Sequence, residues 1–593
     1  MRPEEHHQAA RAQALLAQLT PEQKMAQVSC YFPEDISDTD DFAARYPHGV
    51  GQVSCLQARA VDRLEHVATF QHRVQTAAMS ASGHQIPAIF HMEGLCGGYL
   101  PGATSFPSGI GRASSWDPEL ERHIGAVVGR QERALGITHT FAPVLDISRD
   151  SRMGRQGETY GEDPTLAAAL GVAFVEGVQT DDGGRRSEAV AKHFLGFHHS
   201  EGGIHGAHCD LGDRLLIEVY GKPFQAAITL AGLRGVMPCY NSISGEPASG
   251  SYRLLTELLR EKMGFDGVAV SDYGAVGNLH TVQRVAETFA HAGLLALSAG
   301  MDAELHVPLA FTEDLVPWFA DGRADIALLD QAVLRVLTAK FRMGLFDHPF
   351  ALTGTDLDQT FHHVDDGAVS LRSARESIVL LGNDGSLPLG PVRRLAVIGC
   401  HAATARFFFG GYTHFSLAEG LLAANASMAG LAGGARQLIE NTIPGTAIQA
   451  DDDPQFEALL QRQQPGIRNL VQELTARLPD SEVTWARGYP IAGDDSSGYA
   501  EALAVARDAD VIVLTLGGKH GTSSIASMGE GIDATDINLP PCQEQLIAKL
   551  AKLGKPLIGV HLDGRPLSSD IADRHLNAII EAWSPAEHGA QAI

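Results

Sequence analysis

Residues 264–276 read GFDGVAVSDYGAV, and this stretch decides the fold of the first half of the chain. Residues 268–270 are a short apolar run between Gly267 and Gly274, which is typical of a buried strand. Asp272 lies two residues after this run, so its carboxylate is expected at the carboxyl end of the strand. Barrels of alternating strands and helices have their active sites at this end. Asp272 is therefore a candidate catalytic carboxylate, although an isolated Asp after a strand is more often a turn or helix-cap residue.

Apolar runs alternate with amphipathic stretches from the amino terminus to about Gly344, as in repeated strand–helix units around a parallel sheet. Helices are expected at 119–135 and 325–343. Strands are expected at 86–91, 138–147, 190–194, 235–241, 267–272 and 296–305. The number of repeats favours a TIM-like (β/α)8 barrel, and an open doubly wound sheet is the alternative.

A second region of alternation follows a polar stretch at 345–365 that contains Pro349 and Gly354. We divide the α/β chain into a barrel at 1–348, a linker at 349–365 and a second layered α/β domain at 366–593. Within the last, strands are expected at 393–400, 508–518, 555–564 and 576–583, and helices at 454–478 and 543–553. The small, apolar residues 418–435 are expected to form a packed helix.

The composition excludes several classes of partner. The 593 residues carry a formal charge of -26, which disfavours nucleic acid and anionic membrane surfaces. The seven cysteines show no CxxC pair and are expected to be reduced thiols. The first residues lack the apolar core of a secretory signal, and no apolar stretch is long enough to span a bilayer, so we expect a soluble, cytoplasmic protein.

Four groups of charged residues are expected at the carboxyl ends of barrel strands. They are Glu93 in FHMEGLCGG, the loop with Arg149, Asp150, Arg152, Arg155 and Glu158, the pair Lys192 and His193, and Asp272. Such a set offers many directional hydrogen bonds, as a sugar requires. Taken singly, each also has a structural interpretation: an ion-pair network for the arginine loop, a capping pair for Lys192–His193, and a turn carboxylate for Glu93.

A histidine-rich loop raises the question of a metal. It contains His198, His199, Glu201, His205, His208 and Cys209. Their spacing matches no compact zinc signature, so a loop lining the pocket is the favoured interpretation, and no metal or organic cofactor is expected.

The order of motifs resembles that of the β-glycosidases of glycoside hydrolase family 3, over nearly the whole chain. The motifs are LTPEQKMAQ, GATSFPSGIGRASSWDPEL, RDSRMGRQGETYGEDP, KHF, SDYGA, SAGMDAEL, ESIVLLGNDGSLPL, MGEGIDATDINLP and EAWSPAEHGAQAI. The resemblance implies a TIM-like barrel followed by an α/β sandwich. It also implies hydrolysis of terminal β-linked glucosyl or xylosyl residues with retention of configuration.

The resemblance assigns roles to individual residues. Asp272 would be the nucleophile and Glu530 the acid/base, so the second domain would complete the site. Glu93, Arg155, Lys192, His193, Met237 and Tyr240 would hold the terminal sugar. Tyr240 is further expected to donate a hydrogen bond to Asp272, which would favour its ionised form.

The sequence also departs from the family pattern. Cys96 stands where the family often has His. Ile204 and His205 stand where related sequences often read SEGGRN, so an arginine that could contact the sugar is lost. Family members usually continue beyond the motif at 581–593, so a second domain incomplete at its carboxyl end is expected. The alternatives are a β-N-acetylglucosaminidase, whose short Asp-Ser/Thr-His signature is absent, and a carbohydrate-binding relative with weak or no turnover.

Overall fold

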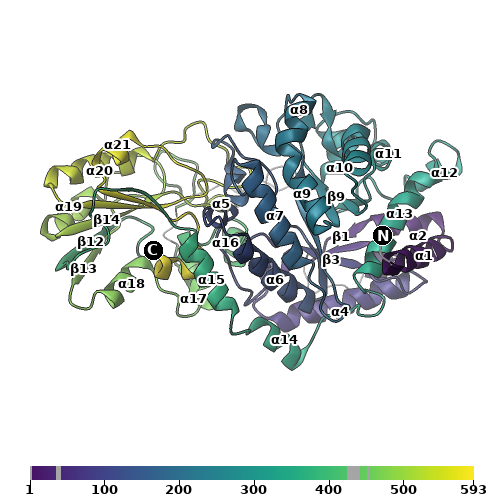
Figure 1. The fold of residues 1–593 in the computed structure, drawn as a ribbon, viewed down its shortest axis with the longest axis horizontal. Coiled ribbons are helices and arrows are strands. Elements are labelled where there is room, and N and C mark those ends of the chain that lie inside the picture. Colours follow the sequence, from purple (N-terminus) through teal and green to yellow (C-terminus); the bar gives the residue numbers. More distant parts are fainter. Residues whose placement is uncertain (1–2, 35–41, 424–440, 451–452) are drawn as a thin grey trace.

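The computed structural model describes residues 3–34, 42–423, 441–450 and 453–593, which form two lobes side by side (Figure 1). The first lobe contains an eight-stranded parallel sheet, in which the strands follow one another in chain order. They are β1 (Cys30–Tyr31), β2 (Gln52–Ser54), β3 (Ile89–Met92), β4 (Ile137–Thr140), β5 (Glu188–Phe194), β6 (Gly235–Pro238), β9 (Val268–Tyr273) and β10 (Ala303–Leu305). This is the barrel expected from the sequence, and it is nearly closed. β10 lies beside β1, but no ladder of described residues joins them.

Helices surround the barrel (Figure 1). The main ones are α1 (Pro3–Leu16), α2 (Pro21–Val28), α4 (Leu64–Ala81), α6 (Pro118–Ala134), α7 (Pro164–Val178), α9 (Lys222–Ala231), α10 (Ala275–Thr281), α11 (Phe289–Ala299) and α13 (Ile326–Arg342). Local signals fix their ends: Asp117 and Asp325 accept backbone hydrogen bonds as N-caps of α6 and α13. Gly344, just after α13, has the positive φ of 75° that favours glycine.

The strand expected at 296–305 is only partly correct. Residues 296–299 are the last turn of α11, whose buried face includes Ala292 and Ala296. Gly300, with φ 107°, ends the helix, and the strand begins at Ala303. Periodicity alone did not separate these elements because a buried helix and a buried strand both give apolar runs.

The expected linker contains a helix, α14 (Gly354–Phe361). α15 (Asp366–Glu376) follows and packs against α6 of the barrel. There the carboxylate of Asp366 accepts hydrogen bonds from Arg130 at 2.5 and 2.6 Å. The segment between the sheets is therefore attached to the barrel.

The second lobe is built on a six-stranded sheet in the order β11-β16-β15-β14-β12-β13. The strands are β11 (Val379–Asn383), β12 (Arg394–Ile398), β13 (Glu482–Ala486), β14 (Val511–Gly517), β15 (Leu557–Leu562) and β16 (Ala578–Glu581). Among the described strands of this sheet, only β11 at the edge is antiparallel to its neighbour. The helices of the second lobe include α16 (His414–Leu422), α17 (Pro454–Gln463), α18 (Leu470–Arg477), α19 (Tyr499–Asp508), α20 (Pro541–Leu550) and α21 (Asp570–His575). Two separate apolar clusters pack between these helices and the sheet.

The single helix expected at 454–478 is two helices. Pro465 and Gly466, which has φ 82°, separate α17 from α18, and Asn469 then caps the new helix in a capping box with Gln472. Of the packed helix expected at 418–435, α16 covers the first residues, and residues 424–440 lie outside the described part of the chain.

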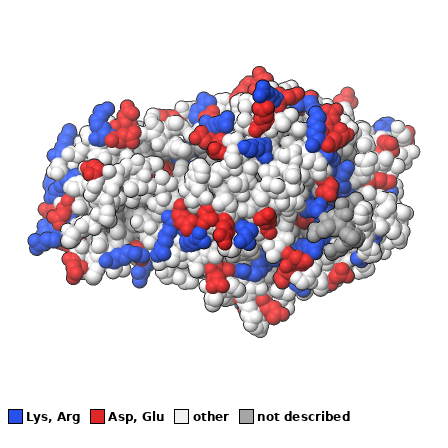
Figure 2. Space-filling view, viewed as in Figure 1, with Lys and Arg blue, Asp and Glu red and all other residues white. Residues whose placement is uncertain are grey.

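No disulfide joins any of the seven cysteines, which all lie among the described residues and are buried. Among the described helices, none combines the length and the apolar character needed to cross a membrane. Figure 2 shows acidic and basic side chains interspersed on one face, with uncharged areas between them.

Candidate active site

A pocket lies where the two lobes meet. Both lobes supply its lining: Leu56, Arg59, Glu93, Tyr99, Arg155, Lys192, Tyr240, Asp272 and Tyr273 from the barrel, and Tyr412, Leu417, Thr522 and Glu530 from the second lobe. The two carboxylates singled out from the sequence therefore face one cavity. Of the six residues expected to hold a sugar, Glu93, Arg155, Lys192 and Tyr240 line it.

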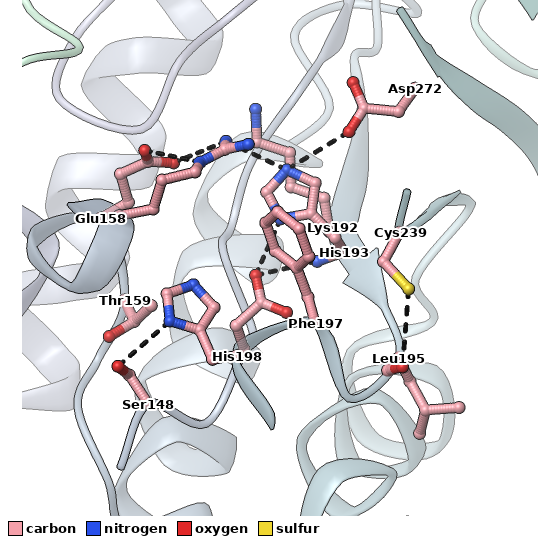
Figure 3. A network of polar contacts seen from close by, with 12 residues as sticks. Ser148, Glu158, Thr159, Lys192, His193, Leu195, Phe197, His198, Cys239 and Asp272 are labelled. Atoms are coloured by element: carbon pink, nitrogen blue, oxygen red, sulfur yellow. Dashed lines mark hydrogen bonds and ion pairs between the residues drawn. The ribbon is translucent and has the colours of Figure 1, made fainter. Parts of the chain in front are cut away.

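Asp272 lies at the end of β9, as the sequence predicted, and is 7 % exposed. Its Oδ1 accepts hydrogen bonds from the Tyr240 hydroxyl at 2.8 Å and from the backbone N–H of Tyr273 at 2.7 Å. The bond from Tyr240 is the one expected from the sequence. Oδ2 accepts no hydrogen bond from the described residues and is 3.7 Å from Nε2 of His193, whose ring Figure 3 shows pointing toward it. One oxygen is thus held while the other is available to react.

Glu530 comes from the loop after β14. Its Oε2 accepts a hydrogen bond from the Tyr412 hydroxyl at 2.6 Å, and its Oε1 is 3.1 Å from Nη1 of Arg155 in the barrel. His205 approaches the same oxygen at 3.7 Å. Donors from both lobes therefore orient this carboxylate.

The loop that carries Glu530 is docked directly on the barrel. The two carboxylate oxygens of Asp533 accept hydrogen bonds from the backbone N–H groups of Gly154 and His205, each at 2.8 Å. A Cβ on Gly154 would lie 2.0 Å from the carbonyl oxygen of Gly529, so only glycine permits this approach. Arg565 of the second lobe adds hydrogen bonds to the carbonyls of Ser151 and Arg152.

Arg155 is the centre of the polar network. It is 2 % exposed and forms a two-point ion pair with Glu158, with both contacts at 2.8 Å. The remaining donors reach Glu530, Tyr412 and Nε2 of His193. His193 in turn contacts Asp146 through Nδ1 at 2.8 Å. A buried guanidinium with this many partners fixes the relative positions of the groups around it.

The pKa values of the two carboxylates are displaced in opposite directions in the ligand-free pocket. Burial raises the pKa of Asp272, and Arg155, Lys192 and Tyr240 oppose that rise. Burial also acts to raise the pKa of Glu530, but Arg155, then His205 and the bond from Tyr412, more than offset it and leave the pKa below its ordinary value. Burial likewise raises the pKa of Glu93 to about 7, against the opposing effect of its ion pair with Lys192.

Two family models match the chain. The glycosyl hydrolase family 3 N-terminal domain matches residues 27–339, and the family 3 C-terminal domain matches residues 378–593. The chain belongs to glycoside hydrolase family 3. Because the second match extends to residue 593, it gives no support to the expectation of a second domain incomplete at its carboxyl end.

Relatives of known name agree with this membership. The chain is 34 % identical to a β-xylosidase of Formosa agariphila over 86 % of its own length and 66 % of the relative's. It is 31 % identical to a periplasmic β-glucosidase of Salmonella typhimurium, over 88 % and 64 %. It thus spans just under two thirds of these relatives. A β-glucosidase structure from Erythrobacter marinus superposes with a TM-score of 0.83 at 30 % identity, covering 99 % of this chain and 75 % of that one.

Several expected residues of this family 3 chain lie away from the pocket lining. Met237 on β6 is 1 % exposed and packs in the barrel interior. Nε2 of His193 is 3.7 Å from Oδ2 of Asp272, but His193 is not part of the lining. Sugar contacts by these two residues remain predictions. Asp150 and Arg152 form an ion pair in which Arg152 is exposed, as the structural interpretation of that loop predicted. Arg149 donates to the carbonyl of Glu162.

The histidine-rich loop supplies one residue to the site. His205 lies beside Glu530, whereas His198 contacts Ser148 (Figure 3) and His199 contacts the Tyr220 hydroxyl. Ile204 is 57 % exposed, and Cys96 is buried 3.9 Å from Arg112. Sequence reasoning missed Tyr412, Tyr99, Arg59 and Thr522, which share no local pattern and meet only through the tertiary fold.

Proposed function

We propose that this family 3 chain is a retaining exo-β-glycosidase that removes single glucosyl or xylosyl residues from the non-reducing ends of β-linked oligosaccharides or small glycosides. The observation that carries the proposal is the convergence of Asp272 and Glu530, from two lobes, on one buried pocket. The names of two relatives, a β-xylosidase and a β-glucosidase, are consistent with either sugar.

In the proposed reaction, the free Oδ2 of Asp272 attacks the anomeric carbon while Glu530 gives its proton to the departing oxygen. Tyr240 and the N–H of Tyr273 hold Oδ1, so the attacking oxygen keeps its orientation. Glu530 then takes a proton from water while the water oxygen attacks the anomeric carbon, which breaks the bond to Asp272 and releases the sugar.

In the ligand-free pocket the pKa of Asp272 is raised and that of Glu530 is lowered, which is the opposite of the displacements that a nucleophile and a proton donor need. We infer that a bound sugar shifts the pKa of Glu530 in the direction that the reaction needs. Sugar hydroxyl groups that accept hydrogen bonds from Arg155 would weaken the hydrogen bond from Arg155 to Glu530. The pKa of Glu530 would then rise, as a proton donor requires. Binding and activation would then be coupled through one guanidinium.

A panel of nitrophenyl β-glucoside, β-xyloside, α-arabinoside and N-acetyl-β-glucosaminide tests the proposal with the wild type, Asp272→Ala and Glu530→Ala. Asp272→Ala should abolish turnover of every substrate. Glu530→Ala should recover part of its turnover of an activated glycoside when azide is added, because the intermediate still forms with a good leaving group but water lacks its base.

Three results would contradict the proposal. They are near-normal activity of Asp272→Ala, near-normal activity of Glu530→Ala without azide, and a wild type that hydrolyses only the N-acetyl-β-glucosaminide. The last would instead favour the glucosaminidase alternative.

A further inference from the structure

Three ligand-type side chains meet inside the second lobe, away from the pocket lining. His561 lies on β15, Asp563 directly follows that strand, and Glu581 is the last residue of the neighbouring parallel strand β16. Residues two apart on a strand face the same side of a sheet, and His561 pairs in register with Glu581. The strand pairing therefore places all three side chains together.

The geometry of the cluster is that of a cation site. One nitrogen or oxygen from each residue lies within 4.8 Å of the others, and Nδ1 of His561 is 3.5 Å from Oδ2 of Asp563. The three residues are 6 %, 0 % and 4 % exposed. Ligand atoms around a tetrahedral zinc ion lie about 3.4 Å apart, so a modest contraction of the side chains would enclose an ion.

The charges of the cluster lack the pairing with lysine or arginine that some other buried acids have. Asp302 is paired with Arg260 and Arg335, and Glu419 with Arg406 and Lys519. In the described part of the chain, neither Asp563 nor Glu581 is in a salt bridge with lysine or arginine. The positive charge of Arg565 interacts favourably with Asp563 at a distance. Its guanidinium, however, donates hydrogen bonds to backbone carbonyls and not to the Asp563 carboxylate.

Two atoms of the cluster have no hydrogen-bond partner among the described residues: Oδ2 of Asp563, which faces His561, and Nε2 of His561. One oxygen of each carboxylate is already oriented by a backbone N–H group. Oδ1 of Asp563 accepts from the backbone N–H of Gly518 at 3.1 Å, and Oε1 of Glu581 accepts from that of Trp583 at 2.8 Å. Asp563 is thus held through one buried oxygen while its other oxygen has no partner among the described residues, as in a carboxylate that binds a metal.

We propose that His561, Asp563 and Glu581 bind one divalent transition-metal ion. One imidazole and two carboxylates suit Zn²⁺ or Mn²⁺, whereas Ca²⁺ favours a shell of oxygen alone. Gly518 begins the loop that leads to Glu530, so the ion braces the base of that loop through Asp563.

Calorimetric titration of the chelator-treated full chain with Zn²⁺, Mn²⁺ and Ca²⁺, each added alone, tests the site. We expect one Zn²⁺ or Mn²⁺ ion per chain and a rise in the thermal midpoint on binding. Asp563→Asn and Glu581→Gln should each weaken binding by about tenfold or more. Glu544→Gln is the matched control, because Glu544 lies in the same lobe and contacts Ser569 instead of the cluster. It should bind as the wild type does.

The wild-type titration decides even where a variant fails to fold. Absence of stoichiometric binding of both Zn²⁺ and Mn²⁺ by the folded wild type would overturn the proposal. So would binding of Ca²⁺ alone, or unchanged affinity in folded Asp563→Asn and Glu581→Gln.

Discussion

Arg155 of the barrel donates a hydrogen bond to Oε1 of Glu530 in the second lobe, at 3.1 Å. The same guanidinium is bound at two points by Glu158, so it cannot follow Glu530 if the lobes separate. The contact makes the ionisation of a second-lobe carboxylate depend on a barrel residue, and so links the closeness of the lobes to the chemistry of the pocket.

The first prediction concerns Tyr412, whose hydroxyl donates to Oε2 of Glu530 and helps to lower the pKa of that carboxyl. Tyr412→Phe removes the donor, so the pKa of Glu530 should rise. The Glu530 carboxyl then stays protonated to higher pH. We expect the ratio of variant to wild-type kcat/KM to increase by up to about tenfold from the acidic to the alkaline end of the profile. A ratio that is constant with pH would contradict this role.

Tyr240→Phe should have its effect on the opposite side of the pH profile. The bond from Tyr240 favours ionised Asp272, so its loss raises a pKa that burial has already raised. Less Asp272 is then ionised in acid, and kcat/KM should fall most below the optimum and least at alkaline pH, where the nucleophile is ionised in both enzymes. The same pH series of a nitrophenyl glycoside measures it, with Tyr252→Phe, an exposed tyrosine, as the control. A loss confined to alkaline pH would show that Tyr240 acts on another group.

Glu188 on β5 gives a prediction about stability. Burial alone would raise its pKa, but Arg342 and His139 lower it from 4.5 to about 2. Because the pKa is lower in the folded than in the unfolded chain, the stabilisation is complete above about pH 4.5 and is lost as the pH falls toward 2. The full difference corresponds to about 3 kcal/mol.

Glu188→Gln should therefore lower the free energy of unfolding at pH 7 and make it fall less steeply than that of the wild type between pH 5 and pH 3.5. Urea unfolding at several pH values measures both. If the free energy of unfolding of the two proteins changed with pH in the same way, Glu188 would have no such part in acid stability.

Asp272 and the barrel could be read from the sequence because their signals are local: a short apolar run, a glycine at each side and a polar residue at the strand end. Glu530 has no such signal, since its loop follows neither helical nor strand periodicity, and only the resemblance to a family identified it. Tyr412 was beyond both kinds of reasoning, and the sequence placed His205 only in a loop expected to line the pocket, without its partner. Their contacts with Glu530 form only when segments distant in the sequence meet at the junction of the lobes.

The last prediction tests that junction. Asp533 accepts hydrogen bonds from Gly154 and His205 of the barrel, and it lies three residues after Glu530. Asp533→Ala leaves both barrel N–H groups without this acceptor and frees the loop, so kcat should fall by about tenfold to a hundredfold, as misplacement of a catalytic group does. Asp536→Ala is the matched control, because Asp536 is in the same loop and, among the described residues, accepts hydrogen bonds only from Asn538.

Azide separates a displaced acid/base from a damaged pocket. If Asp533→Ala loses activity because Glu530 is misplaced, azide should restore part of the turnover of an activated glycoside, as for Glu530→Ala. A fall in kcat without azide rescue, or an equal fall in Asp536→Ala, would mean that the loop affects activity by some route other than the position of Glu530.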